Sequence, residues 1–515
     1  MSVILNKEKI QTGEVICQKY NRTTVECDVI VPDINPDIKR ILDVDGFVSV
    51  SEKIIRSGKI YIQGSVSMTV LYAPDGDVPS KVKNLTVSRE FNHTIDAVGT
   101  EIDSNLSIET EPESFNYSLI NSRKVNLRCT VGISAKLMRT QELELPVSTD
   151  GTNGICTKTT PIKLCSTSVT SENRIVLCKQ LELPSGKPTI GEILKTTVFP
   201  KSEEFSFIDD KARTKGEVRI CTAYTSADDG SFQFTEHTIP FDEIIDVAGA
   251  EEDMEGEVEY SVSDMYCELR DDSDGEARII GFELGLCAVI RGFMIKNPEI
   301  ICDAYSLDGI AEIESEPLTV EQLLDNTTAQ LTHIVSIAIP DILPEIKQIC
   351  DVSASASVDR INVENGEITL FGKLRSKILY ISDDEEMPLG SFSDESEFSQ
   401  TFNLPGCPDD TICDAKVFIE HISYSLSGGG GIDLRAVLGL SLRSYKSGTI
   451  TPVTAITVTE DVRKRKPYII IYFVQKGDSL WKIAKRYRTT VEALKECNDL
   501  SSDHLEIGQR LKICR

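Results

Sequence analysis

Three copies of one sequence pattern occupy most of this 515-residue chain, and they constrain its fold more than any other feature. The segment VPDINPDIKRIL at residues 31–42 recurs as LPSGKPTIGEIL at 183–194 and as IPDILPEIKQIC at 339–350. Because a period of about 150 residues matches the commonest domain size, we expect three homologous domains. The same offsets of 152 and 308 residues relate a Gly and a Tyr in each copy: Gly64 and Tyr72, Gly216 and Tyr224, Gly372 and Tyr380. A Phe with a Gly eight residues later follows in each copy, at Phe91, Phe241 and Phe398.

Each copy is predicted to be mainly antiparallel β-structure. The run IYIQGSVSMTVLY at residues 60–72 is apolar at every second position, which is the period of a strand with one buried face. Gly64 falls on that apolar face and indicates a bend or a close neighbour. In the Pro-x3-Pro segment the second Pro suits the first position of a helix. Ile38, Ile41 and Leu42 have the spacing of one helical face, so we expect one short helix per copy.

The repeat and the composition together predict five segments. The three copies are expected at residues 1–155, 156–311 and 312–460. The sequence RKRKP then predicts a short basic linker at 461–467, because its Pro prevents a helix from continuing. A small C-terminal module is expected at 468–515.

The C-terminal module is predicted to have the order βααβ. The run YIIIYFV at 468–474 is rich in β-branched and aromatic residues and indicates a strand. Asp478 or Ser479 is expected to cap a first helix, and Thr489 with Glu492 fits a capping box that begins a second helix. A final short strand is expected at 511–513, after a turn at Gly508.

Charge is distributed unevenly along the chain. The formal net charge is −28, but residues 462–515 carry thirteen Lys and Arg against six Asp and Glu, so they contribute +7 and the remainder −35. An acidic body repels nucleic acid and anionic lipid, so neither is expected as a partner. No apolar run is long enough to span a bilayer, and no export signal is recognisable, so the protein is expected in the cytosol.

Catalytic chemistry is not indicated. Asp33 with Asp37 and Asp341 with Glu345 could form acid–base pairs, but the middle copy has Ser and Thr at these places, which favours a structural role. The five His are scattered, and no Cys-x-x-Cys pair occurs among the 15 Cys, so no metal site is predicted. We therefore expect no catalytic residue, metal or cofactor, and mostly reduced, buried thiols, with later oxidative cross-linking as the alternative.

The C-terminal module resembles the LysM family. The resemblance rests on Tyr472, Val474, the run GDSLW from Gly477 to Trp481, and the Gly508-Gln509 turn, among other residues. LysM modules usually bind N-acetylglucosamine polymers in a groove between the loop that opens the first helix and the loop after the second. The resemblance therefore implies a groove lined by Gly477, Asp478, Ser479, Leu480 and Trp481 on one side and Asn498, Leu505, Glu506 and Ile507 on the other.

Two departures from the LysM pattern bear on this groove. Glu506 and Ile507 replace the aromatic residue and Pro that commonly precede the Gly-Gln turn, which removes a stacking face for a sugar ring. Arg488 stands where a Gly usually ends the first helix. Trp481 is expected to pack in the small core, with ligand contact as the alternative. A basic rim that could contact a protein consists of Lys476, Lys482, Lys485 and Arg486.

The whole architecture, three Pro-x3-Pro repeats followed by one LysM module, resembles the SPOCS-domain spore-coat morphogenetic proteins of anaerobic endospore formers. The resemblance implies a non-enzymatic adaptor in the mother-cell cytoplasm that joins coat layers to the forespore surface. Its LysM module would dock on the coat-basement ATPase, with other coat proteins as further partners. Two alternatives stay open: a peptidoglycan-binding wall or cortex protein, and a wall hydrolase with a LysM module.

Overall fold

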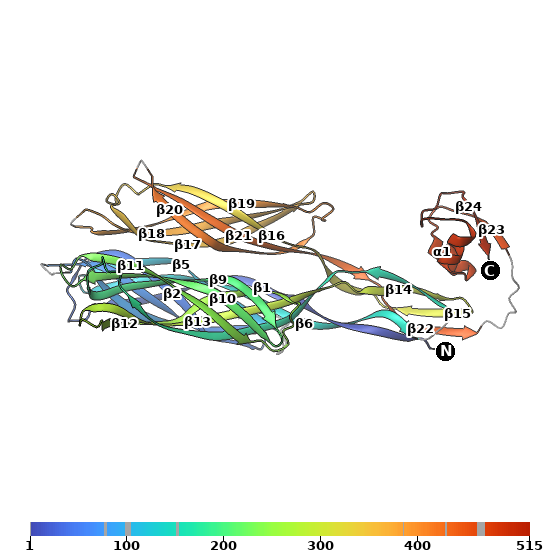
Figure 1. Ribbon diagram of the computed structural model, residues 1–515, viewed down its shortest axis with the longest axis horizontal. Coiled ribbons are helices and arrows are strands. Elements are labelled where there is room, and N and C mark those ends of the chain that lie inside the picture. Colours follow the sequence, from blue (N-terminus) through green and yellow to red (C-terminus); the bar gives the residue numbers. More distant parts are fainter. Residues whose placement is uncertain are drawn as a thin grey trace.

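The computed structural model of the protein is an elongated assembly of β-strands with a small module at one end (Figure 1). It describes residues 2–76, 80–97, 105–150, 154–384, 386–427, 430–460 and 469–514. The predicted basic linker at 461–467 lies outside these residues. The predicted mainly antiparallel β architecture is confirmed, while the limits assigned to each domain stay predictions.

Each copy contains two three-stranded antiparallel sheets. The first copy pairs β1-β6-β5 and β2-β3-β4 and comprises β1 (Ile4–Ile30), β2 (Ile38–Arg56), β3 (Lys59–Pro74), β4 (Lys83–Asp96), β5 (Asn105–Asn121) and β6 (Lys124–Asp150). The second pairs β8-β13-β12 and β9-β10-β11 and comprises β7 (Ile155–Pro161), β8 (Leu164–Glu182), β9 (Ile190–Ile208), β10 (Lys211–Ser226), β11 (Phe232–Asp246), β12 (Glu255–Asp271), β13 (Ala277–Lys296) and β14 (Glu299–Ser306).

The third copy repeats this arrangement with β16-β21-β20 and β17-β18-β19. Its strands are β15 (Gly309–Ser315), β16 (Leu318–Ile337), β17 (Gln348–Glu364), β18 (Glu367–Ile381), β19 (Leu389–Asn403), β20 (Ile412–Leu426), β21 (Ile432–Ile450) and β22 (Val453–Glu460). The C-terminal module consists of β23 (Ile469–Phe473), α1 (Leu480–Tyr487), α2 (Val491–Cys497) and β24 (Arg510–Cys514). We call the three pairs of three-stranded sheets the repeat body.

The short helix predicted in each copy is wrong, because the described residues are helical only in the C-terminal module. Residues 38–42 instead open strand β2. Two β-bulges interrupt its pairing with β3, between Ile38 and Arg40 and between Ile41 and Asp43. Each bulge adds a residue and shifts the alternation, so the buried positions acquire a spacing that imitates a helix. The bulge at Leu42 recurs at Leu194 and Cys350 in the other two copies.

The repeated Pro and Tyr form one structural unit. The Tyr72 hydroxyl donates to the carbonyl oxygen of Pro36 at 3.2 Å, and the ring is fully buried. The same bond joins the corresponding Tyr and Pro in the second copy at 3.2 Å and in the third at 2.8 Å. A buried hydroxyl needs such a partner, which explains why the two residue types recur together.

The repeated Gly lies beneath the repeated Phe, as the predicted close neighbour. Gly216 is paired across the strands with Phe241. A Cβ at this position would lie 2.2 Å from the Lys201 carbonyl oxygen and 2.7 Å from the Phe241 ring. Gly64 and Gly372 have the same contact with Phe91 and Phe398.

Replacing Gly216 by Ala is therefore expected to lower the free energy of unfolding by about 1–3 kcal/mol through overpacking. Gly186 is a matched control in the same copy, since a Cβ there meets nothing within 4 Å. Gly186→Ala should change stability by less than about 0.5 kcal/mol in either direction. Denaturant titration of the full chain measures both, and equal effects would contradict this account of the Gly–Phe contact.

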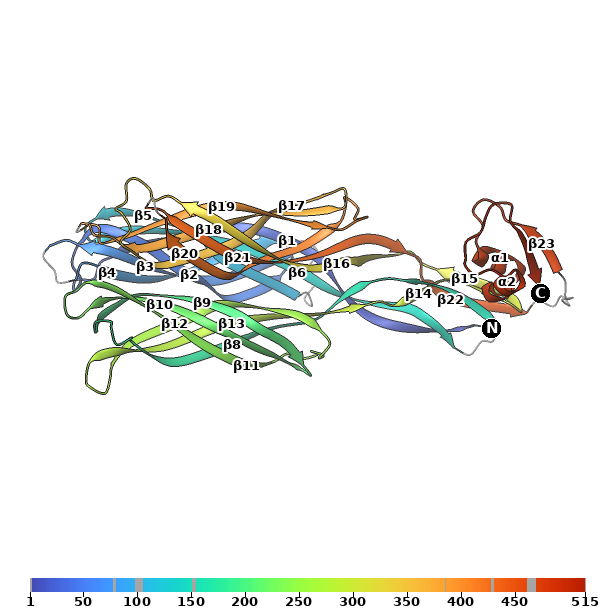
Figure 2. The same cartoon turned by 45° about the horizontal axis from the view of Figure 1, so that its top comes forward.

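The three copies lie side by side (Figure 2), and equivalent residues of all three meet in one cluster along a shared central axis. The bulged residues Leu42, Leu194 and Cys350 belong to one buried hydrophobic cluster. Leu71, Ala223 and Leu379, which the same offsets relate, belong to it as well. The repeat body therefore has approximate threefold symmetry, with each copy contributing the same positions to the centre.

Charged residues at this axis are equivalent in position but not in sign. Asp43, Lys195 and Asp351 occupy corresponding positions in the three copies; the two aspartates are buried, and the Lys195 side chain is 9% exposed. Lys195 Nζ lies 3.2 Å from Asp43, and Lys377 of the third copy lies 2.8 Å from the same carboxylate. Burial alone would raise the pKa of Asp43, but the two lysines outweigh it and hold that pKa below its usual range. The ion pairs thus connect all three copies.

A second layer of charges lies along the same axis. Lys136, Arg291 and Arg443 are equivalent cations, and Arg291 lies 3.1 Å from Glu109 of the first copy and 3.0 Å from Glu259. Lys136 and Arg443 share Asp414, at 3.0 and 3.3 Å. Each copy therefore contacts its neighbour through a different set of ion pairs, although the backbones of the three copies are alike.

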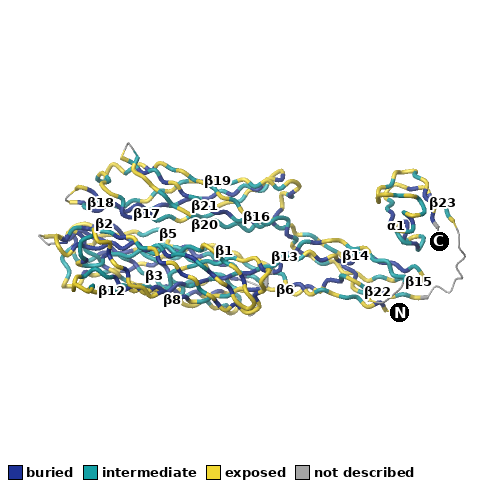
Figure 3. Tube along the Cα trace, in the orientation of Figure 1, coloured by how far each residue is buried: buried dark blue, intermediate teal, exposed yellow. Residues whose placement is uncertain are grey.

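A narrow extension leaves one end of the repeat body, and we call it the stalk. It consists of three two-stranded ribbons: β7 with β14, β15 with β22, and the outer parts of β1 and β6. Apolar residues from all three ribbons are buried between them, including Ile301 on β14 and Ile456 on β22, with Leu5 on β1 packed against them. Figure 3 shows these buried positions continuing from the repeat body into the stalk. The C-terminal module lies at the far end of the stalk (Figures 1 and 2).

Candidate binding site

The fold of the C-terminal module positions the residues predicted to bind a ligand. Ser479 caps α1, and its hydroxyl accepts from the Lys482 backbone N–H at 3.2 Å. Thr490 rather than Thr489 caps α2, accepting from Ala493 N–H at 3.0 Å. Arg488 ends α1 with φ of 52°, the left-handed conformation that a Gly usually supplies. The predicted order βααβ is confirmed.

The loop that opens α1 is held by Asp478. Its carboxylate accepts from the Tyr472 hydroxyl at 2.6 Å and from the Gln475 N–H at 2.8 Å. The bond from Tyr472 is the main reason that the pKa of Asp478 lies below its usual value. Gly477 is exposed, with φ of 89°, and its carbonyl accepts from Lys482 Nζ at 2.9 Å. Asp478 and Ser479 therefore shape this loop through internal bonds.

The second predicted side of the groove lies next to the first. Val474 donates to the Gln509 carbonyl at 3.0 Å and accepts from Gly508 N–H at 2.8 Å, so the two loops are directly bonded. Glu506 and Ile507 are exposed, Ile507 with 73% of its surface accessible. The structure thus brings Gly477, Glu506 and Ile507 to one end of the module.

Other predicted groove residues have internal roles. Leu480 is 2% exposed and belongs to the core of the module. The Asn498 amide donates to the carbonyls of Leu494 and Lys512, at 2.8 and 2.7 Å, and accepts from Lys512 N–H. Leu505 packs on the core and is half-buried.

Of the predicted basic rim, three members remain exposed. They are Lys476, Lys482 and Arg486, and the Arg486 guanidinium lies 5.7 Å from the centre of the Tyr487 ring. The fourth, Lys485, is half-buried and forms an ion pair with Asp303 of the stalk. Trp481 is also directed to the stalk, since its indole N–H donates to Asp303 at 2.7 Å. Trp481 was predicted to pack in the core of the module; it does pack against that core, and it also contacts the stalk.

Sequence reasoning missed two groups of residues around this module. Asp303 and Tyr305 on β14 contact α1, and no local pattern distinguishes them. The outer face of β23 is apolar and exposed, through Ile469, Ile471 and Phe473. The continuous apolar run at 469–474 could have indicated this exposed face. A two-stranded sheet with one buried face needs an apolar residue only at every second position, so the remaining apolar residues must lie on the outer face.

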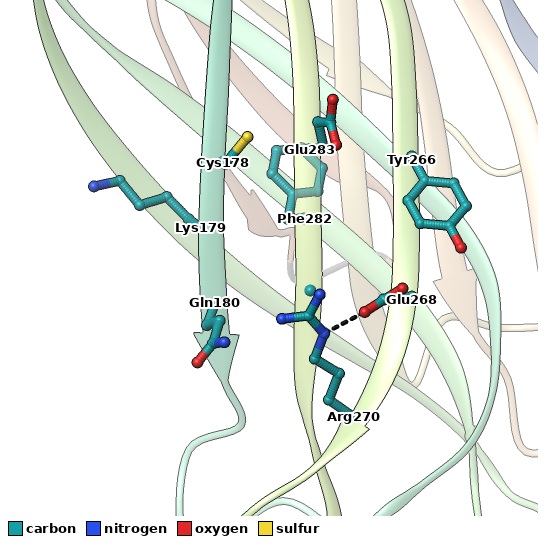
Figure 4. Close-up of a pocket in the computed structure, with 9 residues that line it drawn as sticks. Cys178, Lys179, Gln180, Tyr266, Glu268, Arg270, Phe282 and Glu283 are labelled. Atoms are coloured by element: carbon teal, nitrogen blue, oxygen red, sulfur yellow. Dashed lines mark hydrogen bonds and ion pairs between the residues drawn. The ribbon is translucent and has the colours of Figure 1, made fainter.

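The repeat body contains two concavities that could serve as alternative sites. One of about 370 Å³ lies on β8, β12 and β13 (Figure 4), where Arg270 Nε donates to Glu268 beside Tyr266 and the exposed thiol of Cys178. No His is among its lining residues, so it lacks the Cys–His arrangement of a nucleophile. A larger one of about 1130 Å³ lies between the three copies and is lined by the axial ion pairs of Asp43.

Metal and membrane sites are not found in the described part of the chain. No three His, Cys, Asp or Glu side chains among these residues come together as metal ligands. None of the described helices combines the length and the apolar character needed to cross a bilayer. Among the residues that the structure describes, thirteen Cys are free thiols and Cys497 is disulfide-bonded.

Comparison with known proteins gives three regions of the chain one family and the C-terminal module another. Residues 37–120, 189–270 and 345–427 match the model described as SipL, SPOCS domain, and residues 472–513 match the LysM domain. No solved structure matches the chain.

Individual relatives match through the C-terminal module alone. The probable peptidoglycan endopeptidase LytE of Bacillus subtilis is 55% identical over 42 residues, 8% of this chain and 13% of that protein. The probable endopeptidase p60 of Listeria welshimeri is 38% identical over 70 residues, 14% of this chain and 13% of that protein. The uncharacterized protein YkzQ of Bacillus subtilis is 46% identical over 43 residues, 8% of this chain and 57% of that protein.

The endopeptidase names thus belong to proteins of which this chain covers only about 13%. Neither matched domain is a catalytic family: LysM is a binding module that supports glycan recognition, and the SPOCS domain associates the protein with sporulation. The chain therefore contains three SPOCS domain repeats followed by one C-terminal LysM domain.

Proposed function

We propose that this protein is a non-enzymatic adaptor of spore-coat assembly, made in the mother-cell cytoplasm and located at the forespore surface. Its LysM module docks on the coat-basement ATPase, and its repeat body contacts other coat proteins. The observation that carries the proposal is the architecture: three SPOCS repeats pack together into one body, and a stalk holds one binding module at the far end. This separation suits a protein that connects two layers.

The charges and surfaces of the module support a protein partner. The body carries −35 and the last 54 residues +7, so the module is the cationic end of an acidic molecule. Its groove end presents Ile507 and the cationic rim rather than an aromatic face. Apolar and cationic groups together favour an acidic protein surface over a sugar ring.

Peptidoglycan binding is the second candidate function. It is favoured by the LysM match and by the relatives described as peptidoglycan endopeptidases, whose similarity lies in this module. A wall or cortex protein of this kind would bind N-acetylglucosamine polymers through the same two loops.

Binding assays with the full chain separate the two functions. We expect the purified coat-basement ATPase to be captured and peptidoglycan not to sediment the protein. Reversing the charge of Lys476 and Arg486, which are exposed, should weaken capture about tenfold or more. Reversal of Lys59 and Lys211 on the repeat body is the matched control, since these also are exposed lysines with long ion pairs of 3.6 and 3.9 Å. Sedimentation with peptidoglycan and no capture of the ATPase would favour the second function.

A further inference from the structure

The first LysM helix is bound to the stalk through a small set of specific contacts. Asp303 on β14 accepts from the Trp481 indole N–H at 2.7 Å and pairs with Lys485 Nζ. The Tyr305 ring meets the Trp481 ring edge-to-face with centroids 4.9 Å apart. The Tyr305 hydroxyl donates to the Thr489 carbonyl at 2.7 Å. We call these five residues the stalk contact.

The stalk contact is well packed. Tyr305 is 4% exposed and belongs to the hydrophobic core of the LysM module, although it lies in the second SPOCS copy. Cys156 and Leu307 of the stalk pack on the same cluster. Burial would raise the pKa of Asp303, but Lys485 and Trp481 outweigh it and lower that pKa. The Tyr305 ring is buried and the ionised Asp303 carboxylate has hydrogen-bond partners, as is typical of a specific interface between two domains.

A β-bulge directs Asp303 and Tyr305 toward the module. The pairing of β14 with β7 shifts between Ile301 and Asp303, so Cys302 is the additional residue. Ile301 is buried between the stalk ribbons, whereas Asp303 is directed to α1. A bulge reorients the side chains that follow it, which explains how a strand of the stalk presents a polar pair to a neighbour.

The other two ribbons have the same bulge but not the same residues. The additional residues there are Val147 and Thr454, at the offsets of 155 and 307 residues that also relate Lys136, Arg291 and Arg443. The residues after the bulge are Ser148 and Ala455 in place of Asp303. Only the second ribbon therefore carries Asp-x-Tyr, and the LysM module contacts that ribbon.

We propose that the face of α1 with Trp481 and Lys485 is a binding surface for a carboxylate followed two residues later by an aromatic ring on an extended strand. In this protein β14 occupies the surface intramolecularly. A partner strand with the same chemistry binds there by displacing β14. This inference rests on the proposed function in one respect, which is that the displacing strand belongs to a partner protein. The surface on α1 and the strand β14 that occupies it are both part of this chain.

The length of the connection between β22 and β23 determines how strongly β14 competes with a free strand for the surface of α1. The last residue of β22 precedes the first of β23 by nine positions, a span of at most roughly 30 Å. A short connection of this kind gives an effective concentration on the order of millimolar. A free peptide must therefore reach millimolar concentration to compete with β14 in the intact protein, and it should bind more readily once β14 is disabled.

Trp481 is the only Trp of the chain, so its fluorescence reports on this contact without a label. In the full chain, Asp303→Ala should raise acrylamide quenching of Trp481 about two-fold, since the indole loses its bond to the stalk. Asp303→Glu, which keeps the carboxylate, should restore part of the protection. Ser148→Ala, at the same position of another ribbon, is the matched control and should leave quenching unchanged.

A peptide tests the chemistry of the surface. The synthetic strand EIICDAYS, residues 299–306, is added at millimolar concentration to the full chain carrying Asp303→Ala and Tyr305→Ala. It should protect Trp481 from acrylamide, whereas a peptide with Ala at both positions should not. Unchanged quenching in Asp303→Ala, or no protection by the peptide, would each overturn the proposal. Neither measurement uses the coat-basement ATPase or peptidoglycan, so failure here is distinct from failure of the proposed function.

Discussion

Replacing Lys195 by Met is expected to lower the free energy of unfolding of the repeat body by about 3 kcal/mol, as for a buried ion pair that loses one member. Lys195 is 9% exposed and pairs with Asp43, which is 1% exposed, and with Asp45. Met keeps the volume of the side chain but leaves three carboxylates, Asp43, Asp45 and Asp351, with less compensating charge at the axis. Denaturant unfolding of the full chain measures the loss.

Lys201→Met is the matched control for this prediction. Lys201 lies on the same strand, β9, but 42% of its side chain is exposed, and the carboxylate of its partner Glu217 is 4.0 Å away. Exposed pairs of this length contribute little, so the change should stay below about 0.5 kcal/mol. A loss at Lys201 as large as at Lys195 would contradict a special role of the axial charges.

The axial ion pairs also give the Lys195→Met effect a defined pH dependence. The pKa of Asp43 is lower in the folded protein than in the unfolded chain, where it is about 3.9. The stabilisation by its lysine partners is therefore complete above pH of about 4 and is lost as the pH falls through the folded-state pKa. The difference between wild type and variant should be constant from neutral pH to about pH 5 and shrink in stronger acid.

Replacing Trp481 by Ala is expected to release the LysM module from the stalk and to abolish capture of the protein partner. The substitution removes the bond to Asp303 and the ring contact with Tyr305. Loss of a half-buried indole should lower the stability of so small a module by about 2–3 kcal/mol. Hydrogen exchange of the α1 and α2 amides in the full chain measures the stability, and capture by the coat-basement ATPase measures docking.

Two variants separate folding from recognition in this experiment. Trp481→Phe keeps a ring but lacks the N–H donor, so it should retain a folded module while weakening the stalk contact. Glu496→Ala, on the exposed surface of α2 and outside the predicted groove and rim, should leave both readouts close to wild type. If Trp481→Ala were captured as well as wild type, the indole would have no part in docking.

Sequence reasoning was most successful where a local period has one structural cause. The strand at 60–72 and the βααβ order of the module follow directly from apolar spacing and capping residues. The prediction of a helix at residues 38–42 was wrong because two β-bulges change the spacing of the buried positions. A bulge has no sequence period by which it could be recognised.

The candidate site was predicted less completely, for a different reason. The LysM resemblance identified the two loops, and the structure bonds them together. It could not show that Trp481 and Lys485 contact Asp303, since that contact joins residues 178 and 182 positions apart. The sequence also could not predict that Asp43 pairs with Lys195. The constant offsets between the copies predict that the three domains share one fold, but they do not show that equivalent residues of the three domains contact one another.

The charged axis bears on why the three SPOCS copies occur in a single chain. If three identical subunits assembled around this axis, each buried position would bring three copies of the same residue together. Three aspartates or three lysines at the place of Asp43, Lys195 and Asp351 would repel one another in a medium of low dielectric constant. Covalent fusion allows each copy to carry a different sign at that place. A gene fusion of three repeats can thus evolve a centre that no homotrimer of one repeat could have, and the order of the copies becomes a heritable property of the protein.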